Sequence, residues 1–142
     1  MIDRELITRK LALIMADLKA LAPFAGKPLD DFLAGQLDEV VAERYLERIV
    51  GRMIDVNYHL ITEAGNPPPP DYYQSFTQLG TLGILPHALA RQIAACAGLR
   101  NRLVHEYDEI DPALVHAAAA SAVRDVPEYL RLIRQHIERS CP

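Results

Sequence analysis

Five polar side chains that could do chemistry lie within eight residues of the segment "GLRNRLVHEYDEIDP": Arg100, Asn101, Arg102, His105 and Tyr107. A histidine that titrates near neutral pH can transfer protons, and a guanidinium can stabilise negative charge that develops in a transition state. An asparagine can orient either group through its amide. These residue types favour acid–base chemistry beside an anionic group. Such chemistry requires that the surrounding elements bring the side chains close together.

Arg100 occupies a position that the apolar pattern predicts to face the core. Leu89, Ile93, Cys96 and Leu103 recur at spacings of four, three and seven, and Arg100 falls in the same stripe. Burying an unpaired guanidinium is costly. Arg100 therefore needs a carboxylate partner, a wet groove, or an interface that an anionic ligand can reach.

The spacing of Arg100 and His105 does not by itself bring the two side chains together. They lie about 140° apart around a straight helix, whereas Asn101 and His105 share a face. A joint site requires that the helix distorts near its end, that the arginine side chain wraps around it, or that a second copy completes the site across a two-fold axis. A simpler interpretation is that His105 only stabilises the negative end of the helix and that Arg102 is solvated.

A second polar cluster lies on one face of an earlier helix, in "RMIDVNYHLI". Arg52, Asp55 and His59 occupy positions i, i+3 and i+7 of that helix. Asp55 or His59 could pair with Arg100 from across the fold and so resolve its burial. The alternative is a surface salt bridge with a solvated histidine, since such pairs are common.

The elements that must position these residues are predicted to be helices. Apolar spacings of three and four, interrupted by "APFAGKP", "GNPPPPD" and "GTLGILP", predict an all-α fold, an antiparallel bundle of four long helices and one short helix. Asp111 and Pro112 are an N-cap and a first-turn proline for the last helix, in which Pro127 should produce a kink. The predicted helices are residues 3–22, a second helix that begins after the Asp30-Asp31 pair and ends near residue 64, then 72–79, 86–105 and a last helix from residue 112.

Composition narrows the class of protein. A chain of 142 residues predicts a single domain, 1–142, and its net charge of −4 argues against nucleic-acid binding by bulk electrostatics, so any RNA contact must be local and DNA binding is not expected. Cys96 and Cys141, the two cysteines, form neither a disulfide framework nor a zinc-type spacing, and no metal site is expected. No apolar run approaches the roughly 20 residues of a membrane span, and no signal segment is evident, so we expect a cytoplasmic protein without a membrane partner.

The string "LRNRLVHEYDEID" resembles the R-x4-H-x-Y signature of HepT-like toxins of the HEPN superfamily. The preceding "ERIVGRMIDVNYHLI", the proline loop and "FTQLGTLGILP" follow in the order that such proteins show, so the resemblance extends along the whole chain. It implies one HEPN-type helical domain in which Arg100, Asn101 and His105 form a ribonuclease motif. It also implies homodimers whose motifs face a shared cleft.

The resemblance implies a metal-independent endoribonuclease toxin of a type II- or type VII-like toxin–antitoxin pair. RNA carries its own nucleophile, the 2′-OH, so His105 would transfer protons and Arg100 would stabilise the phosphorane, leaving 2′,3′-cyclic phosphate ends. Arg102, Asp55 and His59 would support the site or bind RNA.

The resemblance also implies a partner, a nucleotidyltransferase antitoxin that attaches AMP to Tyr107 and thereby blocks RNA. No cofactor is expected for this chain, because ATP and Mg²⁺ would belong to that partner. One alternative is a non-catalytic helical protein that docks the nucleotidyltransferase and serves only as its acceptor. Another is a plain dimeric bundle with Arg100 in an internal salt bridge.

Overall fold

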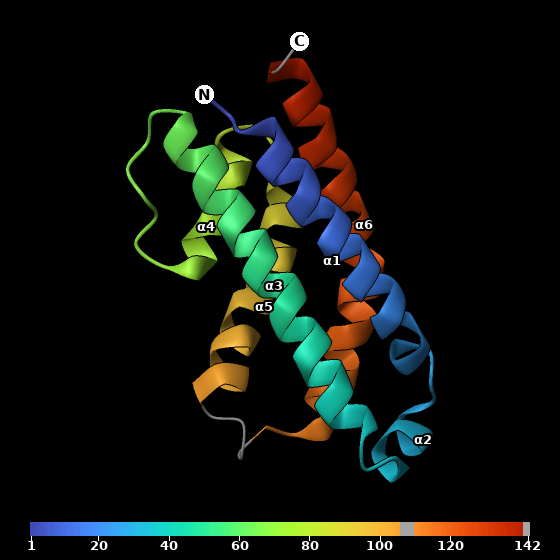
Figure 1. The fold of residues 1–142 in the computed structure, drawn as a ribbon. Helices are drawn as coiled ribbons and strands as arrows, with labels where there is room; N and C mark the ends of the chain where they lie inside the picture. The colour runs from blue at the N-terminus through green and yellow to red at the C-terminus, as the bar shows by residue number, and fades with distance from the viewer. Residues whose placement is uncertain (106–109, 141–142) are drawn as a thin grey trace.

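The computed structural model describes residues 1–105 and 110–140, with the backbone alone at residues 104 and 105. The described residues form an all-α fold, as predicted (Figure 1). No helix among them is long and apolar enough to cross a bilayer. The helices are α1 (Arg4–Ala25), α2 (Leu29–Ala34), α3 (Asp38–Glu63), α4 (Tyr72–Thr81), α5 (His87–His105) and α6 (Pro112–Ser140).

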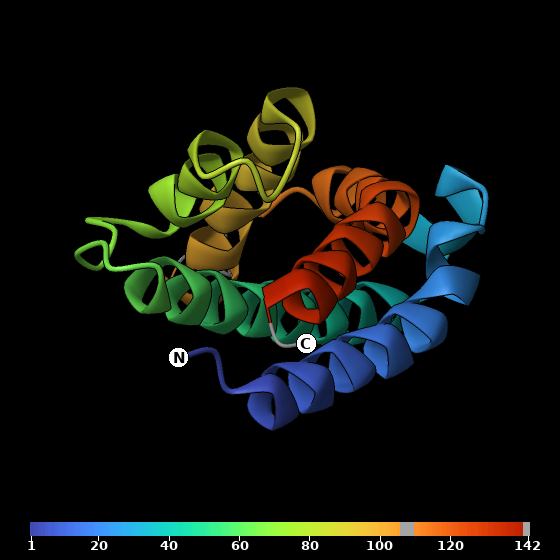
Figure 2. The ribbon, with the colours of Figure 1, turned by 90° about the horizontal axis from the view of Figure 1, so that it is seen from above.

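The long helix α3 is central, because it contacts α1, α4, α5 and α6. Seen from above, α1 and α3 lie side by side as one layer, and α4, α5 and α6 lie across it (Figure 2). The stripe predicted on the first helix and the stripe predicted on the second are both buried in one core. These residues are Ile7, Leu11, Ile14, Leu18 and Leu21 of α1, and Leu46, Ile49, Met53, Val56 and Leu60 of α3.

The prediction of one continuous helix after Asp30-Asp31 is wrong, because the chain forms α2 and then α3 there. The break falls at Gly35, whose backbone is extended (φ −85°, ψ 109°). A Cβ on Gly35 would lie 2.8 Å from the Asp38 carboxyl group, so the glycine lets the chain pass close to the start of α3. Residues 1–105 and 110–140 therefore contain two short helices, α2 and α4, where the sequence predicted one.

The start of the last helix is confirmed at residue level. The Asp111 carboxylate accepts a hydrogen bond from the Ala113 N–H at 2.9 Å, and Pro112 is the first residue of α6. Helix α6 continues through Pro127 to Ser140. The kink expected at Pro127 stays a prediction.

A buried hydrogen-bonded chain of polar side chains ties α6, α3 and α4 together. The Tyr129 hydroxyl donates to Asn57 Oδ1 at 2.6 Å, and Asn57 Nδ2 donates to the Ser75 hydroxyl oxygen at 3.2 Å. The Ser75 hydroxyl in turn donates to the Tyr72 carbonyl at 2.7 Å. All three side chains are buried, so this network fixes the first turn of α4 relative to α3.

Candidate functional site

Arg100 lies in the penultimate turn of α5 with its side chain partly buried. Its guanidinium carbon lies 5.3 Å from the centre of the Tyr72 ring, a cation–π geometry. Its Nε–H is buried and has no hydrogen-bond partner, and no carboxylate in residues 1–105 or 110–140 forms an ion pair with it. Of the three environments that the sequence allowed for Arg100, the structure provides the groove.

That groove is a hollow of about 460 Å³ between α1, α3, α4 and α5, here called the Arg100 hollow. Asp55 and His59, which the sequence placed near Arg100, both line it. The face of α3 that carries Asp55 and His59 therefore lies opposite Arg100, as their helical spacing predicted. The full lining is Leu6, Lys10, Gly51, Ile54, Asp55, Tyr58, His59, Tyr72 and Arg100.

Neither Asp55 nor His59 pairs with Arg100, however, because α1 and the residues before it supply their partners. The Asp55 carboxylate accepts from Lys10 Nζ at 3.1 Å. His59 Nε2 accepts from the backbone N–H of Asp3 at 2.9 Å, so a neutral imidazole there carries its proton on Nδ1. The idea that α3 neutralises Arg100 directly is thus corrected, and the guanidinium charge stays available to a ligand.

Asn101, the next residue of the predicted motif, is exposed and lines a second hollow of about 330 Å³. The rings of Tyr58 and Tyr72 meet edge to face at 6.2 Å, and both residues line both hollows. Pro70 and Asp71, from the proline loop, complete the wall of the second hollow. Arg100 therefore lines one hollow and Asn101 lines the other, and the rings of Tyr58 and Tyr72 belong to the walls of both.

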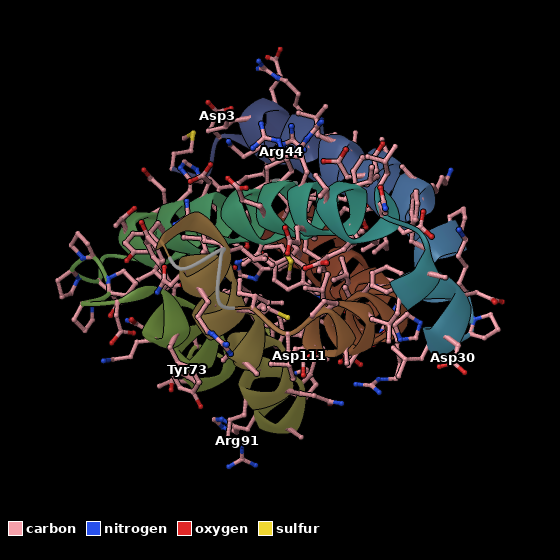
Figure 3. All side chains as sticks on the ribbon, turned by 90° about the horizontal axis from the view of Figure 1, so that it is seen from below. Asp3, Asp30, Arg44, Tyr73, Arg91 and Asp111 are labelled. Carbon is pink, nitrogen blue, oxygen red and sulfur yellow. The ribbon has the colours of Figure 1, made fainter. Side chains whose placement is uncertain are left out.

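The Tyr58 phenol is a neutral donor in this wall. Burial raises the pKa of Tyr58, and the negative charges of Tyr72, when ionised, and Asp71 raise that pKa further. Its hydroxyl donates to the Pro69 carbonyl at 3.2 Å, which holds the proline loop against α3. Tyr73, one residue after Tyr72, is 49% exposed and points away from the body of the molecule (Figure 3).

The remaining predicted site residues are placed only in part. Helix α5 continues through His105, of which the backbone alone is described, so the way in which His105 joins Arg100 stays a prediction. Arg102 is exposed on α5. Tyr107 lies outside the described residues. Within the part of the chain that the structure describes, no three His, Cys, Asp or Glu side chains gather as a metal-ion site would require.

The motif spacing did not single out Lys10, Gly51, Tyr58 or Tyr72 as residues of the Arg100 hollow. Lys10 is brought there from a distant helix by the fold. Gly51 did carry a signal, because a glycine inside a helical pattern calls for a reason. Tyr58 belongs to the quoted string "RMIDVNYHLI" and lies three residues after Asp55, so the helical spacing already placed it on the face that lines the hollow.

Comparison with known families gives one family match. The family described as ribonuclease HepT-like matches residues 14–133. A relative from Aphanizomenon flos-aquae (strain 2012/KM1/D3), the tRNA nuclease HepT, is 38% identical over 136 residues, which cover 96% of this chain and 92% of the relative. The match therefore spans nearly the whole of both chains.

Solved structures share the fold at lower sequence identity. A tri-AMPylated HEPN toxin from Shewanella oneidensis, solved in complex with an MNT antitoxin, superposes with a TM-score of 0.82 at 23% identity, covering 95% of this chain and 99% of that one. A cytosolic protein of unknown function from Bacillus subtilis, YutE, superposes with a TM-score of 0.83 at 16% identity, covering 99% of this chain and 94% of that one. These structures show that the helical arrangement described above is a known fold.

Proposed function

This chain belongs to the ribonuclease HepT-like family, and from that membership we propose that it is an endoribonuclease and the toxin of a toxin–antitoxin pair. The single observation in the fold that supports this most is Arg100. It is a partly buried guanidinium that lines a hollow and has no carboxylate partner among the described residues. Such a cation is arranged to receive an anion, and a phosphate of RNA is the anion that this family implies.

The proposed reaction is a transesterification that needs no metal ion. His105 removes the proton from a 2′-OH, whose oxygen then forms a bond to the adjacent phosphorus. Arg100 stabilises the charge on the phosphorane, and the bond from phosphorus to the 5′-oxygen breaks as that oxygen takes a proton. The products carry a 2′,3′-cyclic phosphate on one side of the cut and a 5′-hydroxyl on the other. Asn101 would orient the phosphate or the imidazole.

The proposed partner is a nucleotidyltransferase antitoxin. Family membership supports it, together with the Shewanella relative of the same fold, which is an AMPylated toxin in complex with such an antitoxin. The partner would transfer AMP from ATP to the Tyr107 hydroxyl and release pyrophosphate, using Mg²⁺ in its own site. The adduct would add bulk and negative charge next to the motif and so repel RNA. A homodimer would supply the Arg100 and His105 of one site from two copies.

The deciding experiment is cleavage of RNA in excess EDTA by purified protein whose intact mass shows that Tyr107 is unmodified. A tRNA pool is the first substrate, because the cyanobacterial relative is a tRNA nuclease. Wild type should cut it and leave cyclic phosphate ends, while His105→Ala and Arg100→Ala should not. Arg91→Ala is the matched control. Arg91 is an exposed arginine of the same helix, and its side chain points away from the body of the molecule (Figure 3).

Two results would reject the proposal. One is equal cleavage by wild type and His105→Ala, which would mark a contaminating nuclease. The other is intact tRNA and total RNA after incubation with unmodified wild type. If co-expression with the nucleotidyltransferase then still added AMP-sized mass that Tyr107→Phe abolishes, the chain would be an acceptor and docking partner instead.

A further inference from the structure

We propose that the Arg100 hollow binds one unpaired nucleotide of the RNA strand beside the cleavage motif, with its phosphate against Arg100 and Lys10 and its base against the apolar wall. This inference rests on the proposed ribonuclease function and adds a substrate subsite to it. The subsite lies on the α1, α3 and α4 side of α5, and the motif spacing alone does not indicate it. Three features of the hollow support it: the glycine at position 51, the charges of the lining and the apolar walls.

Gly51 is the first observation. It lies in the middle of α3, where a glycine destabilises a helix by about 1 kcal/mol relative to alanine. No positive φ requires it, and a Cβ at Gly51 would meet no atom within 4 Å. By contrast, a Cβ on Gly80 would meet Ala90 and His87 at 3.2 Å, so that glycine permits close packing of α4 on α5. Packing does not explain Gly51, whereas an open hollow does, because Gly51 is part of its lining.

The charges of the hollow are the second observation. Lys10 enters from α1 and Arg100 from α5, so two cations from different helices line the same space. Lys10 pairs with Asp55 at 3.1 Å, but the Asp55 side chain is 59% exposed and the pair lies at the rim. Arg100 has no ion pair with any described residue. The hollow thus keeps an uncompensated positive charge in a chain whose net charge is −4.

The walls are the third observation. Leu6, Ile54, Tyr58 and Tyr72 give the hollow an apolar and aromatic lining of the kind on which an unstacked base packs. Tyr72 is held in place from behind, because the buried Tyr129–Asn57–Ser75 network ends on its carbonyl. The guanidinium over the Tyr72 ring is therefore presented on a rigid surface. Such preorganisation lowers the entropic cost of binding.

Size and composition together favour a nucleotide over a bare anion. The hollow, at about 460 Å³, falls in the range of small-molecule sites, whereas a phosphate alone would need only the charged rim. The Asp55 carboxylate can accept from a 2′-OH or from an exocyclic amino group of a base. An apolar wall, two cations and one acceptor match the three parts of a ribonucleotide.

The first test fills the hollow without endangering the fold. Gly51→Leu places a side chain into open space and removes a helix glycine, so its melting temperature should equal or exceed that of wild type. We expect its KM for RNA to rise about tenfold with kcat little changed, and Gly51→Ala to cause a smaller rise. Ala16→Leu is the matched control, because it adds the same side chain to an exposed position of α1. An unchanged KM in Gly51→Leu would overturn the inference.

The second test measures binding without catalysis. The four ribonucleoside 5′-monophosphates, and inorganic phosphate separately, are titrated into ¹⁵N-labelled wild type. At least one nucleotide should shift the amide signals of Gly51, Tyr72 and Arg100 to saturation, and Gly51→Leu should abolish the effect. Phosphate alone should bind more weakly than that nucleotide. Absence of saturating shifts with all four nucleotides would overturn the inference.

The two tests separate this inference from the proposed function. If wild type cleaves RNA but Gly51→Leu has an unchanged KM and nucleotides cause no shifts, the ribonuclease stands and the subsite is rejected. If no RNA is cut but nucleotides saturate the hollow in wild type only, the subsite stands and the ribonuclease assignment is rejected.

Discussion

Two arginines that face the interior, Arg52 of α3 and Arg100 of α5, have opposite surroundings. Arg52 pairs with Asp17 of α1, a carboxylate that is only 5% exposed and that also forms an ion pair with Arg48 at 3.1 Å. Arg100 has an aromatic ring beneath it, an unpartnered Nε–H and an open hollow in front. Arg52 thus belongs to a structural ion-pair cluster, whereas the positive charge of Arg100 is not compensated by any described carboxylate.

The difference teaches that burial of an arginine says little until its partner is known. A partly buried guanidinium opposite a buried carboxylate contributes to stability, since removing either partner leaves a charge without compensation. A guanidinium without such a partner contributes little to folding and is free to stabilise a substrate. Arg52 and Arg100 should therefore respond to truncation in opposite ways.

The largest effect is expected for Arg100→Ala, on activity. Loss of one charge-stabilising donor should lower kcat for RNA cleavage by about 10²–10³-fold. The free energy of unfolding should change by less than about 1 kcal/mol, because only a cation–π contact is lost and an unpaired buried Nε–H disappears. Cleavage kinetics and urea denaturation on one preparation measure both. A large loss of stability with unchanged specific activity would make Arg100 structural and remove the contrast.

The next effect is expected for Arg52→Ala, on stability. The free energy of unfolding should fall by about 1–3 kcal/mol, since Asp17 stays buried with Arg48 as its remaining partner. Cleavage per folded molecule should not change. Arg44→Ala is the control on the same helix, because Arg44 forms an exposed i,i+3 pair with Glu47 at 3.3 Å and should contribute less than about 0.5 kcal/mol. Equal destabilisation by the two variants would contradict the buried-pair account.

A smaller effect is expected for Tyr72→Leu, which removes the ring under Arg100 but keeps an apolar side chain. Because the ring positions the guanidinium, its loss should lower kcat/KM about five- to thirtyfold, which corresponds to about 1–2 kcal/mol of transition-state stabilisation. Tyr72→Phe should lose less, because the ring stays. Single-turnover cleavage by the two variants measures the difference. If both lose activity equally, the Tyr72 hydroxyl matters and not its ring.

The smallest effect concerns an uncompensated negative charge, at Glu43 of α3. Burial first, and then the charge of Glu39 and a hydrogen bond with Glu39, together raise the pKa of Glu43 to about 7. Because the folded chain binds this proton more tightly than the unfolded chain does, the free energy of unfolding should decrease as pH rises from 4.5 to about 7. Melting temperatures across this range should fall less in Glu43→Gln than in wild type. Parallel curves would contradict the assignment.

Much of the fold could be predicted because its signals are local. The apolar stripes of α1 and α3, the prolines at residues 67–70 and the Asp111-Pro112 start of α6 depend on helical periodicity, on the missing proline N–H and on a capping carboxylate. The break between α2 and α3 could not be predicted in this way. It depends on how closely Gly35 approaches the Asp38 side chain.

The candidate site was predictable in residue type but only partly in geometry. The sequence indicated that Arg100 lies on a core-facing stripe and that Asp55 and His59 share a face, and the structure brings these three residues to one hollow. Over residues 87–103 of α5, the buried positions are nevertheless Ala90, Ile93, Ala94, Ala97 and Leu103, whereas Leu89 and Cys96 are only partly buried. The small alanines allow α5 to approach its neighbours, a property that hydrophobicity alone does not reveal.

The sequence by itself determined the helical class, the helix boundaries set by proline and capping residues, and the motif that leads to Arg100, because each depends on residues a few positions apart. The tertiary structure decided which charges are compensated. It brought Lys10 to Asp55, Asp17 to Arg52 and Tyr72 to Arg100, three pairings that join different helices. Such partners follow from how helices pack against each other, and no periodicity within one helix encodes them. That packing leaves Arg100 open to a ligand while Arg52 is neutralised.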